Sequence, residues 1–380
     1  MNNHTKPKLL LVADTYYPKV DGTLKFIEEF MKRAQDSFEI SLLVPDYGMH
    51  KGKKVTYIEV SKIWKVSGYS NLKLAPSNFK KMKKAIQEAD LVFIQGPAMI
   101  SYLSVYYAHK FNKKTFFYTH TISWELFEKF FPRIFKRPFY SIIKRLSIAL
   151  YNRCDEILVP YHELKEMLEL EGVQSSITTA RLGVDIDLFN PTADRKESKA
   201  NLHLDPGKKV IGYVGRISKE KNTQLLLESF QKLEEQDNLT LLMVGDGPEK
   251  QTKKFKQIKN CKVTGFVSNV QDYLKAMDIF VMPSLTETTS LATLEAMSSG
   301  LPVIATRVGF IKSYIIKNHN GLFFPRNSAT VLSSKIQKLL KDRELRERLG
   351  QNARKTVAYG FSWERSINRI KRILLKQYYN

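Results

Sequence analysis

The stretch Asp278–Gly300 reads DIFVMPSLTETTSLATLEAMSSG and contains a strand, a loop and a helix in succession. The apolar run after Asp278 is short and ends at Pro283, which is typical of a buried parallel strand. Polar residues follow this run, and a helix is expected to begin near Ser290. A strand, a loop and a helix form the repeating unit of parallel α/β folds, so the stretch predicts that fold class.

Two carboxylates flank the start of this helix. Glu287 lies in the loop, and Glu295 lies in the helix eight positions later. A mostly helical connection would separate them by about 12 Å of rise, which is similar to the length of a sugar nucleotide from ribose to hexose. Each carboxylate would then accept hydrogen bonds from hydroxyls at one end of a single ligand. The backbone N–H groups expected to face the diphosphate between those ends belong to Thr288, Thr289, Ser290 and Leu291. The alternative is a polar loop before an ordinary helix with a solvated glutamate.

A basic loop precedes this stretch in the sequence. Gly212–Asn222 reads GYVGRISKEKN, and its strand ends at Gly215, where the missing side chain allows a ligand to approach the backbone. Arg216 and Lys221 follow in the same loop, and together they can neutralise a diphosphate leaving group. Such contacts strengthen in the transition state, because the leaving group gains negative charge. The alternative is a solvated basic loop.

Short apolar strands alternate with amphipathic helices along the whole chain, which predicts two Rossmann-like halves. We expect domains at residues 1–187 and 188–360, and a C-terminal helix at 361–380 that packs back on the first domain. The polar stretch 192–209 is expected to be a linker. Two such sheets facing each other would line one cleft with the carboxyl ends of their strands. The expected strands are Lys8–Ala13, Glu39–Val44, Leu91–Gln95, Thr115–Thr119, Glu156–Pro160, Val210–Val214, Leu239–Val244, Lys262–Gly265, Ile279–Pro283 and Pro302–Ala305.

The first half offers two further candidate site residues. Gly22 precedes a helix, where a phosphate or a sugar can approach the backbone. His120 follows the end of a strand and can hydrogen-bond a sugar hydroxyl, although a histidine in that position is often structural. The sequence contains neither GxGxxG nor GxxxxGK[ST], so it predicts neither dinucleotide nor P-loop binding.

The composition places the chain among globular proteins with a basic surface. Of its 380 residues, 43% are hydrophobic, and 61 basic against 38 acidic residues give a net charge of +23. The two cysteines lie far apart, which favours a reducing, cytoplasmic compartment. The start of the chain does not resemble a secretory signal. The nearest candidate for a membrane span, Leu91–Ala108, is better explained as a strand, a turn and a helix.

Taken together, these segments resemble the family-4 retaining glycosyltransferases, which have the GT-B fold of two Rossmann-like domains. The E-x7-E element of that family corresponds to Glu287 and Glu295, and EAMSSGLPVIAT continues from it. Beside it stand GRISKEKN, MVGDGPE at Met243–Glu249 and VTGFV at Val263–Val267. The resemblance implies that the first domain binds the acceptor and the second binds a nucleotide-diphosphate sugar.

The resemblance also implies a role for each matching residue. Arg216 and Lys221 would hold the donor diphosphate, Glu287 would bind sugar hydroxyls and Glu295 would bind the ribose. The backbone around Phe266 and Val267 would meet the base, and His120 would contact the donor sugar with Gly22 close to it. The family needs neither a metal nor a cofactor. It transfers with retention, by a front-face substitution in which the leaving phosphate helps to deprotonate the acceptor; a covalent Glu287 intermediate is the less favoured alternative.

Two departures from the family pattern concern the acceptor and the fine donor geometry. The usual glycine-rich first loop reads Asp21-Gly22-Thr23, so only one glycine carries over. The loop after the first glutamate reads ETTSL, where many members carry a glycine or a phenylalanine. The Tyr-His-Thr setting of His120 resembles members that glycosylate diacylglycerol-type lipids.

A basic and aromatic segment suggests contact with a membrane. Lys129–Arg153 contains seven Lys or Arg residues and no Asp or Glu, with aromatic residues between the charges. This combination favours an interface with anionic lipid on the inner face of the cell membrane. Alternatively, Ile142, Ile143, Leu146 and Leu150 simply pack a helix onto the first domain. The residues expected to touch the membrane are Phe130, Phe131, Arg133, Lys136 and Arg137.

We therefore expect an enzyme that transfers a hexose from a UDP-glucose-like or GDP-mannose-like donor to a membrane glycerolipid. A soluble sugar or a growing glycan is the alternative acceptor. A nucleotide-sugar-binding protein without catalysis is disfavoured by the retained His120, Arg216, Lys221, Glu287 and Glu295. A basic nucleic-acid-binding protein is a remote alternative, because no binding module is present and the charge is spread over both halves. We expect no nucleic-acid partner.

Overall fold

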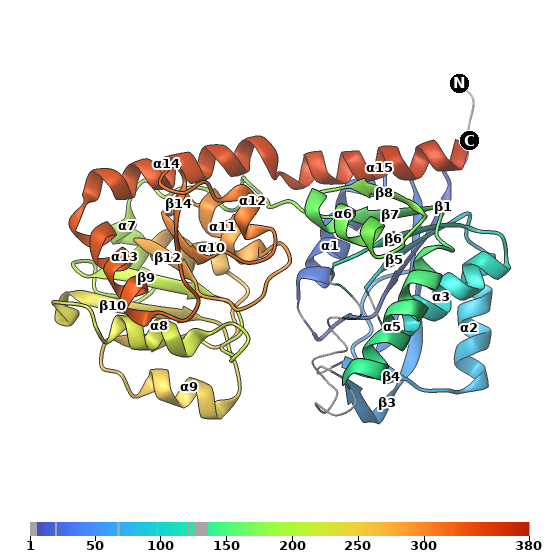
Figure 1. Cartoon of the computed structure of the whole chain (residues 1–380), viewed down its shortest axis with the longest axis horizontal. Helices are drawn as coiled ribbons and strands as arrows, with labels where there is room; N and C mark the ends of the chain where they lie inside the picture. Colours follow the sequence, from blue (N-terminus) through green and yellow to red (C-terminus); the bar gives the residue numbers. More distant parts are fainter. Residues whose placement is uncertain are drawn as a thin grey trace. The chain divides into compact units, whose positions relative to one another are not determined.

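The computed structural model describes residues 6–19, 21–66, 69–96, 98–120, 122, 124 and 136–379. The chain divides into two compact units, one formed by residues 1–181 and 364–380 and the other by residues 182–363. The sequence placed these boundaries at 187/188 and 360/361, a few residues away. Each unit has its own sheet with helices packed against it, which confirms the predicted α/β class (Figure 1).

The sheet of the first unit has the strand order β4-β3-β2-β1-β5-β6-β7-β8, and only the pairing of β3 with β4 is antiparallel. Its strands are β1 (Lys8–Ala13), β2 (Glu39–Asp46), β3 (Val55–Val66), β4 (Tyr69–Leu72), β5 (Leu91–Gln95), β6 (Lys114–Tyr118), β7 (Glu156–Val159) and β8 (Ser176–Thr179). The helices of this unit are α1 (Gly22–Ala34), α2 (Pro76–Gln87), α3 (Met99–Lys110), α5 (Lys136–Tyr151), α6 (His162–Leu170) and α15 (Trp363–Tyr379).

Both faces of this sheet are buried, which explains why its central strands are apolar throughout. Leu10 and Val12 of β1 belong to one hydrophobic cluster, together with Met82 of α2 and Val105 of α3. On α1, Phe26 packs against Phe93 of β5 and Tyr118 of β6, and Phe30 also contacts Phe93. Alternate residues of each strand therefore serve opposite layers of core.

The second unit has a parallel sheet with the order β11-β10-β9-β12-β13-β14. Its strands are β9 (Lys209–Val214), β10 (Leu239–Val244), β11 (Cys261–Val263), β12 (Ile279–Met282), β13 (Val303–Thr306) and β14 (Gly321–Phe324). Its helices are α7 (Arg195–Ala200), α8 (Thr223–Phe230), α9 (Glu249–Lys256), α10 (Val270–Ala276), α11 (Leu291–Ser298), α12 (Ile311–Tyr314), α13 (Ala329–Lys341) and α14 (Arg343–Gly360), with a 3-10 turn at Gln236–Asn238.

Several elements differ from the sequence prediction. The strands β3, β4, β8 and β14 were not predicted, and the expected linker at 192–209 contains the helix α7. That helix has no apolar periodicity, because its sequence is RKESKA. It forms because the Asp194 side chain caps the N–H groups of Lys196 and Glu197, and because the ammonium of Lys199 is buried against Asp278.

The segment Leu91–Ala108 folds as a strand and a helix, β5 and α3, as predicted. Among the described residues, no helix combines the length and the apolar character that crossing a bilayer requires.

Candidate active site

The candidate donor-binding residues of the second unit follow four neighbouring strands of one sheet. Phe266 follows β11, Gly245 follows β10, Arg216 follows β9 and Glu287 follows β12. Because these strands are parallel and adjacent, their carboxyl ends form one edge of the sheet. Three strand spacings from β11 to β12 amount to about 14 Å, which is similar to the extended length of a sugar nucleotide.

An ion pair between two of these loops lies at the centre of this edge. The Nζ of Lys221 lies 2.6 Å from Oε1 of Glu287, and only 21% and 9% of the two side chains are exposed. The Oγ of Ser284 donates to the same Oε1 at 2.7 Å. Two donors thus fix one carboxylate oxygen of Glu287 and leave its Oε2 as an acceptor for another group.

The backbone of the Glu287 loop is held from three sides. The N–H of Leu285 donates to the carbonyl of Glu220 at 3.0 Å, which joins this loop to the one that carries Lys221. The carbonyl of Thr288 accepts from the N–H of Phe310 at 2.8 Å. The carbonyl of Thr289 accepts from the buried hydroxyl of Tyr314 at 2.9 Å. The carbonyls of the loop are therefore committed to the protein.

The N–H groups at the end of the same loop, unlike that of Leu285, have no acceptor in the part of the chain that the structure describes. Within the described part of the chain, the backbone N–H groups of residues 288–291 donate to no protein acceptor, and the buried Oγ1 of Thr289 has no partner either. Ser290 holds the left-handed conformation at φ 59°, which a non-glycine residue adopts at a cost of about 1 kcal/mol or more. The loop presents its donors in the way an anion-binding helix N-terminus requires.

The helix α11 begins at Leu291, so the separation of Glu287 from Glu295 is only partly helical. The helix begins where the sequence predicted, near Ser290, but the condition of a mostly helical connection, with its rise of about 12 Å, is not met because residues 287–290 form a loop. Four helical steps from Leu291 to Glu295 account for about 6 Å. The side chain of Glu295 is half-buried.

Glycines allow the phosphate-side loops to run close together. Gly215 has φ +141°, and a Cβ on Gly245 would lie 2.1 Å from the carbonyl oxygen of Gly215. A Cβ on Gly247 would likewise lie 2.0 Å from the carbonyl oxygen of Ile217. Arg216 extends from this packed backbone with 62% of its side chain exposed, 3.8 Å from a carboxylate oxygen of Glu220. Its guanidinium is therefore accessible to a ligand.

The predicted base-binding residues lie at the far end of this edge. The ring of Phe266 is 67% exposed, and Val267 is half-buried. A bridge between Gly245 and Gly265 places this loop beside the loop that follows β10. An exposed aromatic ring beside backbone groups is suited to packing against a planar base.

In the first unit, three polar residues lie at the carboxyl edge of its own sheet. Asp14 follows β1, Gln95 ends β5 and His120 follows β6, and these three strands are neighbours. The buried carboxylate of Asp14 accepts from the backbone N–H groups of Ala98 at 2.9 Å and Ile100 at 3.1 Å, at the start of α3. Burial raises the pKa of Asp14, and these hydrogen bonds oppose that rise.

His120 is fixed by an amide and by aromatic rings. Its Nε2 lies 2.7 Å from Oε1 of Gln95, and its ring lies 4.5 Å from that of Tyr118 and 5.6 Å from that of Phe26, centre to centre. Because an amide oxygen can only accept, Nε2 carries the hydrogen and Nδ1 keeps its lone pair. Burial lowers the pKa of His120 to about 3, so the ring is neutral at physiological pH.

Gly22 is the first residue of α1 and is exposed. The side chain of Asp21 accepts from the N–H groups of Thr23 and Leu24, both at 3.0 Å. The start of this helix is thus capped by its own aspartate. The N–H groups of Thr23 and Leu24 are therefore committed to Asp21.

The predicted membrane segment is only partly visible. Phe130, Phe131 and Arg133 lie outside the described residues, and of Lys136 and Arg137 the structure describes only the backbone, at the start of α5. Farther along α5, Ile143 and Leu150 pack against the core of the first unit.

Two other apolar residues of α5 do not pack as the alternative explanation of this helix requires. Ile142 and Leu146 are 54% and 60% exposed. The two residues lie one helical turn apart and form an apolar strip on the surface.

Four residues that help to form the Glu287 loop or the polar sheet edge of the first unit were not predicted as site residues. Ser284 and Tyr314 donate hydrogen bonds to the Glu287 loop and Gln95 accepts one from His120, while Asp14 accepts from backbone N–H groups at the start of α3. Ser284, Gln95 and Asp14 each lie within two positions of the end of a strand, and polar residues in that position could have been selected on that ground. Tyr314 gives no such signal, because a distant turn brings it to the loop.

Two family descriptions match the chain in succession. Residues 20–188 match Glycosyltransferase Family 4, and residues 194–356 match Glycosyl transferases group 1. The two matches follow the division between the units and together cover most of the chain.

Curated relatives include a sugar transferase and an enzyme named for the synthesis of a glycolipid. The chain is 33% identical to the sulfoquinovosyl transferase SQD2 of Arabidopsis thaliana over 62% of its own length and 46% of that protein. It is 25% identical to the alpha-monoglucosyldiacylglycerol synthase of Streptococcus pneumoniae over 78% of its length and 70% of that protein. The chain spans about half the length of the first curated relatives that it matches.

Solved structures share the fold. HepE of Anabaena in complex with UDP aligns with a TM-score of 0.78 and 17% identity, over 97% of this chain and 100% of that one. HepE has also been solved with UDP-glucose. At this identity, the similarity establishes the two-domain GT-B fold.

Proposed function

This chain belongs to the glycosyltransferases, and from that membership we propose that it transfers a hexose from a nucleoside-diphosphate sugar to a membrane glycerolipid. The observation that carries the proposal is the ion pair of Lys221 with Glu287, which joins two loops at the carboxyl edge of the second sheet. A cation and a carboxylate at this edge suit the two chemically different ends of the bond that breaks, a phosphate and a sugar.

The donor is proposed to lie along this edge. The base packs near Phe266 and Val267, with the ribose on Glu295, the diphosphate at Arg216 and Lys221, and the sugar hydroxyls on Glu287. Gly215 admits the phosphates to the backbone, and the uncommitted N–H groups of residues 288–291 supply further donors. UDP-glucose is the preferred donor over GDP-mannose, because a structure of the same fold was solved with UDP-glucose.

The proposed reaction is a front-face substitution with retention and without a metal. The acceptor hydroxyl oxygen bonds to the anomeric carbon as the bond from that carbon to the phosphate oxygen breaks. The hydroxyl proton passes to the departing phosphate, so the products are the glycoside and the nucleoside diphosphate. Arg216 and Lys221 stabilise the negative charge that builds on the diphosphate.

His120 is proposed to contact the donor sugar as a neutral group. Its Nε2–H is engaged by Gln95, so Nδ1 accepts a hydrogen bond from a sugar hydroxyl. The low pKa of about 3 makes it a poor proton acceptor, in keeping with a reaction in which the leaving phosphate takes the acceptor proton.

The proposal of a lipid acceptor is supported by the first unit and by the relatives. Ile142 and Leu146 are exposed on α5, which lies within the basic and aromatic segment Lys129–Arg153. Apolar side chains next to Lys and Arg suit binding to the surface of an anionic membrane. One relative carries the name of a glycolipid-forming enzyme. We therefore propose a location on the inner face of the cell membrane.

The experiment that tests the proposed function offers both acceptor classes to one protein. Purified protein is incubated with UDP-glucose and EDTA, with either diacylglycerol in anionic vesicles or a panel of soluble sugars. We expect a glucosyl lipid by mass spectrometry, with an α-anomeric proton by NMR. Transfer to soluble sugars alone would replace the lipid acceptor with the alternative one, and a β-linked product would contradict retention.

A further inference from the structure

A second polar cavity lies within the second unit, at the opposite edge of its sheet. Its lining includes Lys209 at the start of β9, Asp278 just before β12 and Pro302 just before β13. These are the amino-terminal ends of strands whose carboxyl ends lead to the candidate donor site. The cavity has a volume of about 690 Å³, which lies within the range of small-molecule sites.

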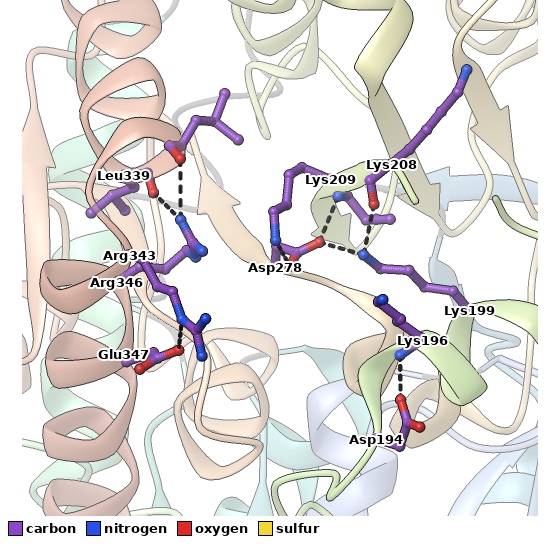
Figure 2. Close-up of polar contacts among 12 residues, drawn as sticks. Asp194, Lys196, Lys199, Lys208, Lys209, Asp278, Leu339, Arg343, Arg346 and Glu347 are labelled. Atoms are coloured by element: carbon purple, nitrogen blue, oxygen red, sulfur yellow. Dashed lines mark hydrogen bonds and ion pairs between the residues drawn. The ribbon is translucent and has the colours of Figure 1, made fainter. Parts of the chain in front are cut away.

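The lining of this cavity is strongly cationic. Eight of its residues are Lys or Arg, and two are acidic, Asp278 and Glu347. Three of the charged residues belong to α7 and five to α14, while Lys209 begins β9 and Asp278 precedes β12. Figure 2 shows Arg343, Arg346 and Glu347 of α14 across the opening from Lys199, Lys209 and Asp278.

Both acidic side chains already have cationic partners. Asp278 Oδ2 lies 2.7 Å from Nζ of Lys199 and accepts from the N–H of Val210 at 2.8 Å, while its Oδ1 lies 3.4 Å from Nζ of Lys209. Glu347 Oε1 lies 2.7 Å from Nε of Arg343 (Figure 2). These pairs use up the negative charge of the lining.

The remaining cations have no carboxylate partner. Among the residues that the structure describes, no ion pair is formed by Arg195, Lys196, Arg346, Arg354 or Lys355. The Nη1 of Arg195 is also buried without a hydrogen-bond partner in that part of the chain. A buried guanidinium nitrogen that donates to nothing is costly, which points to a missing acceptor.

The guanidinium groups on the two sides repel each other. Burial lowers the pKa of Arg195, Asp278 opposes this effect, and the charge of Arg346 lowers the pKa further. Arg346 is held in place, because its Nη1 donates to the carbonyls of Leu339 at 2.6 Å and Leu340 at 3.3 Å (Figure 2). An anion between Arg195 and Arg346 would relieve this repulsion.

We propose that this cavity is a second binding site, separate from the donor site, for an anion that carries at least two phosphate charges. Guanidinium groups bind phosphate oxygens in pairs, and ammonium groups add point charges. Arg195 and Lys196 contact it from α7, and Arg346 and Lys355 contact it from α14. The ligand is either a free phosphorylated solute or the headgroup of an anionic lipid.

The test is a calorimetric titration of the full chain with inorganic pyrophosphate. The double variant Arg195→Gln/Lys196→Gln should bind about tenfold or more weakly than the unmodified protein. The matched control Lys232→Gln/Lys253→Gln removes two exposed cations of the same unit outside the cavity and should bind normally. Thermal melting verifies folding, and Lys355→Gln on α14 serves as an independent second variant.

Two outcomes distinguish this site from the proposed donor site. If Lys221→Ala keeps pyrophosphate binding that Arg195→Gln/Lys196→Gln loses, the cavity is a separate site. If Lys221→Ala abolishes the binding and the cavity variant does not change it, the proposal is overturned while the proposed function stands.

A sedimentation experiment with lipid vesicles identifies the source of the phosphate groups. Phosphatidylcholine vesicles with and without cardiolipin, whose headgroup carries two phosphates, are sedimented with each protein. Cavity-dependent binding of pyrophosphate but not of cardiolipin vesicles indicates a free solute, and cavity-dependent binding to cardiolipin alone indicates a headgroup. The proposal fails if neither ligand distinguishes the cavity variant from its control.

Discussion

At the residue scale, one or two hydrogen-bonding partners position each important polar side chain of the candidate site. One oxygen of Glu287 receives both Lys221 and Ser284, so the carboxylate is positioned before a ligand arrives. His120 is oriented by Gln95 in the same manner. Polar groups fixed in advance do not have to be reoriented at the moment of reaction, which is the main way such sites lower a barrier.

Replacing Glu287 by Gln keeps the shape of the side chain but removes its charge. We expect kcat for glucosyl transfer to fall by about 100-fold, because hydroxyl groups bind a neutral amide less strongly than a carboxylate. The measurement is initial-rate kinetics with UDP-glucose. Glu228→Gln, on the exposed side of α8, is the matched control and should keep full activity. Equal rates for the two variants would remove Glu287 from the proposed site.

His120 should remain neutral across the physiological range. Burial lowers its pKa from 6.5 to about 3, so the neutral ring stabilises the fold above about pH 6.5, and this stability is lost as the pH falls toward 3. NMR of the ring protons, assigned with a His120→Gln variant, should show no titration from about pH 5 to pH 8. A titration step near pH 6.5 would show that the ring is accessible to protons and would reopen a role in proton transfer.

At the element scale, the loop between β12 and α11 is shaped by residues distant in sequence. Gly309, after β13, has φ +50°, and a Cβ there would lie 1.8 Å from the carbonyl oxygen of Glu287. The N–H of Phe310 and the hydroxyl of Tyr314 then donate hydrogen bonds to the next two carbonyls of the loop, those of residues 288 and 289. The position of Glu287 therefore depends on the turn that follows the neighbouring strand.

Gly309→Ala should displace the Glu287 loop. The clash and the left-handed backbone together should lower the free energy of unfolding by about 1–3 kcal/mol. The protein should remain folded under assay conditions, yet its transfer activity should drop, because Glu287 is displaced. Gly172→Ala is the control, because Gly172 also has positive φ (+97°) but no atom near its added Cβ. Chemical denaturation and kinetics of both variants separate backbone strain from loop displacement. Full activity in Gly309→Ala would contradict the account of the loop.

The sequence predicted most of the elements that show strong apolar periodicity and missed several that do not. β1, β5 and β10 have the predicted bounds, because they are apolar runs with clear ends. The helix α7 was taken for linker, because its stability comes from the Asp194 cap and from a buried pair with Asp278 that is distant in sequence. β14, with the sequence GLFF, is an apolar run of the same length as β12 and β13 and was nevertheless missed, so an apolar pattern alone was not sufficient.

The candidate site was predicted only in part, because local sequence patterns show which residues follow a strand but not which tertiary contacts they make. Short-range spacing placed Lys221 and Glu287 in loops after strands, and the parallel sheet then made these loops neighbours. Spacing did not show that Ser290 would adopt a left-handed conformation just before the helix α11 begins. It also gave no sign of Gly309 or Tyr314, since their contribution depends on tertiary contacts.

At the scale of the whole molecule, the two units offer different surfaces to different partners. The first unit exposes Ile142 and Leu146 on α5, and the second carries both the candidate donor edge and the cationic cavity. The net charge of +23 attracts the chain to anionic surfaces in general, so specific contacts must be separated from this background.

Membrane binding should depend on the exposed apolar strip of α5. We expect Ile142→Ser/Leu146→Ser to reduce sedimentation with anionic vesicles several-fold, because two apolar side chains no longer enter the interface. Leu74→Ser/Leu170→Ser changes two residues of the same unit that are 69% and 87% exposed, and it should bind normally. Sedimentation at moderate salt limits the contribution of net charge. Equal binding by both variants would rule out this strip as the membrane contact.

The central claim is that Lys221 and its neighbours bind the diphosphate of a sugar nucleotide without a metal. Calorimetric titration of UDP-glucose in excess EDTA, on the unmodified chain, on Lys221→Ala and on the exposed neighbour control Lys219→Ala, tests it most directly. The account predicts clear binding by the first and third proteins, and an affinity about tenfold or more lower for Lys221→Ala. Equal affinities for all three proteins, or binding that appears only when Mg²⁺ is added, would contradict it.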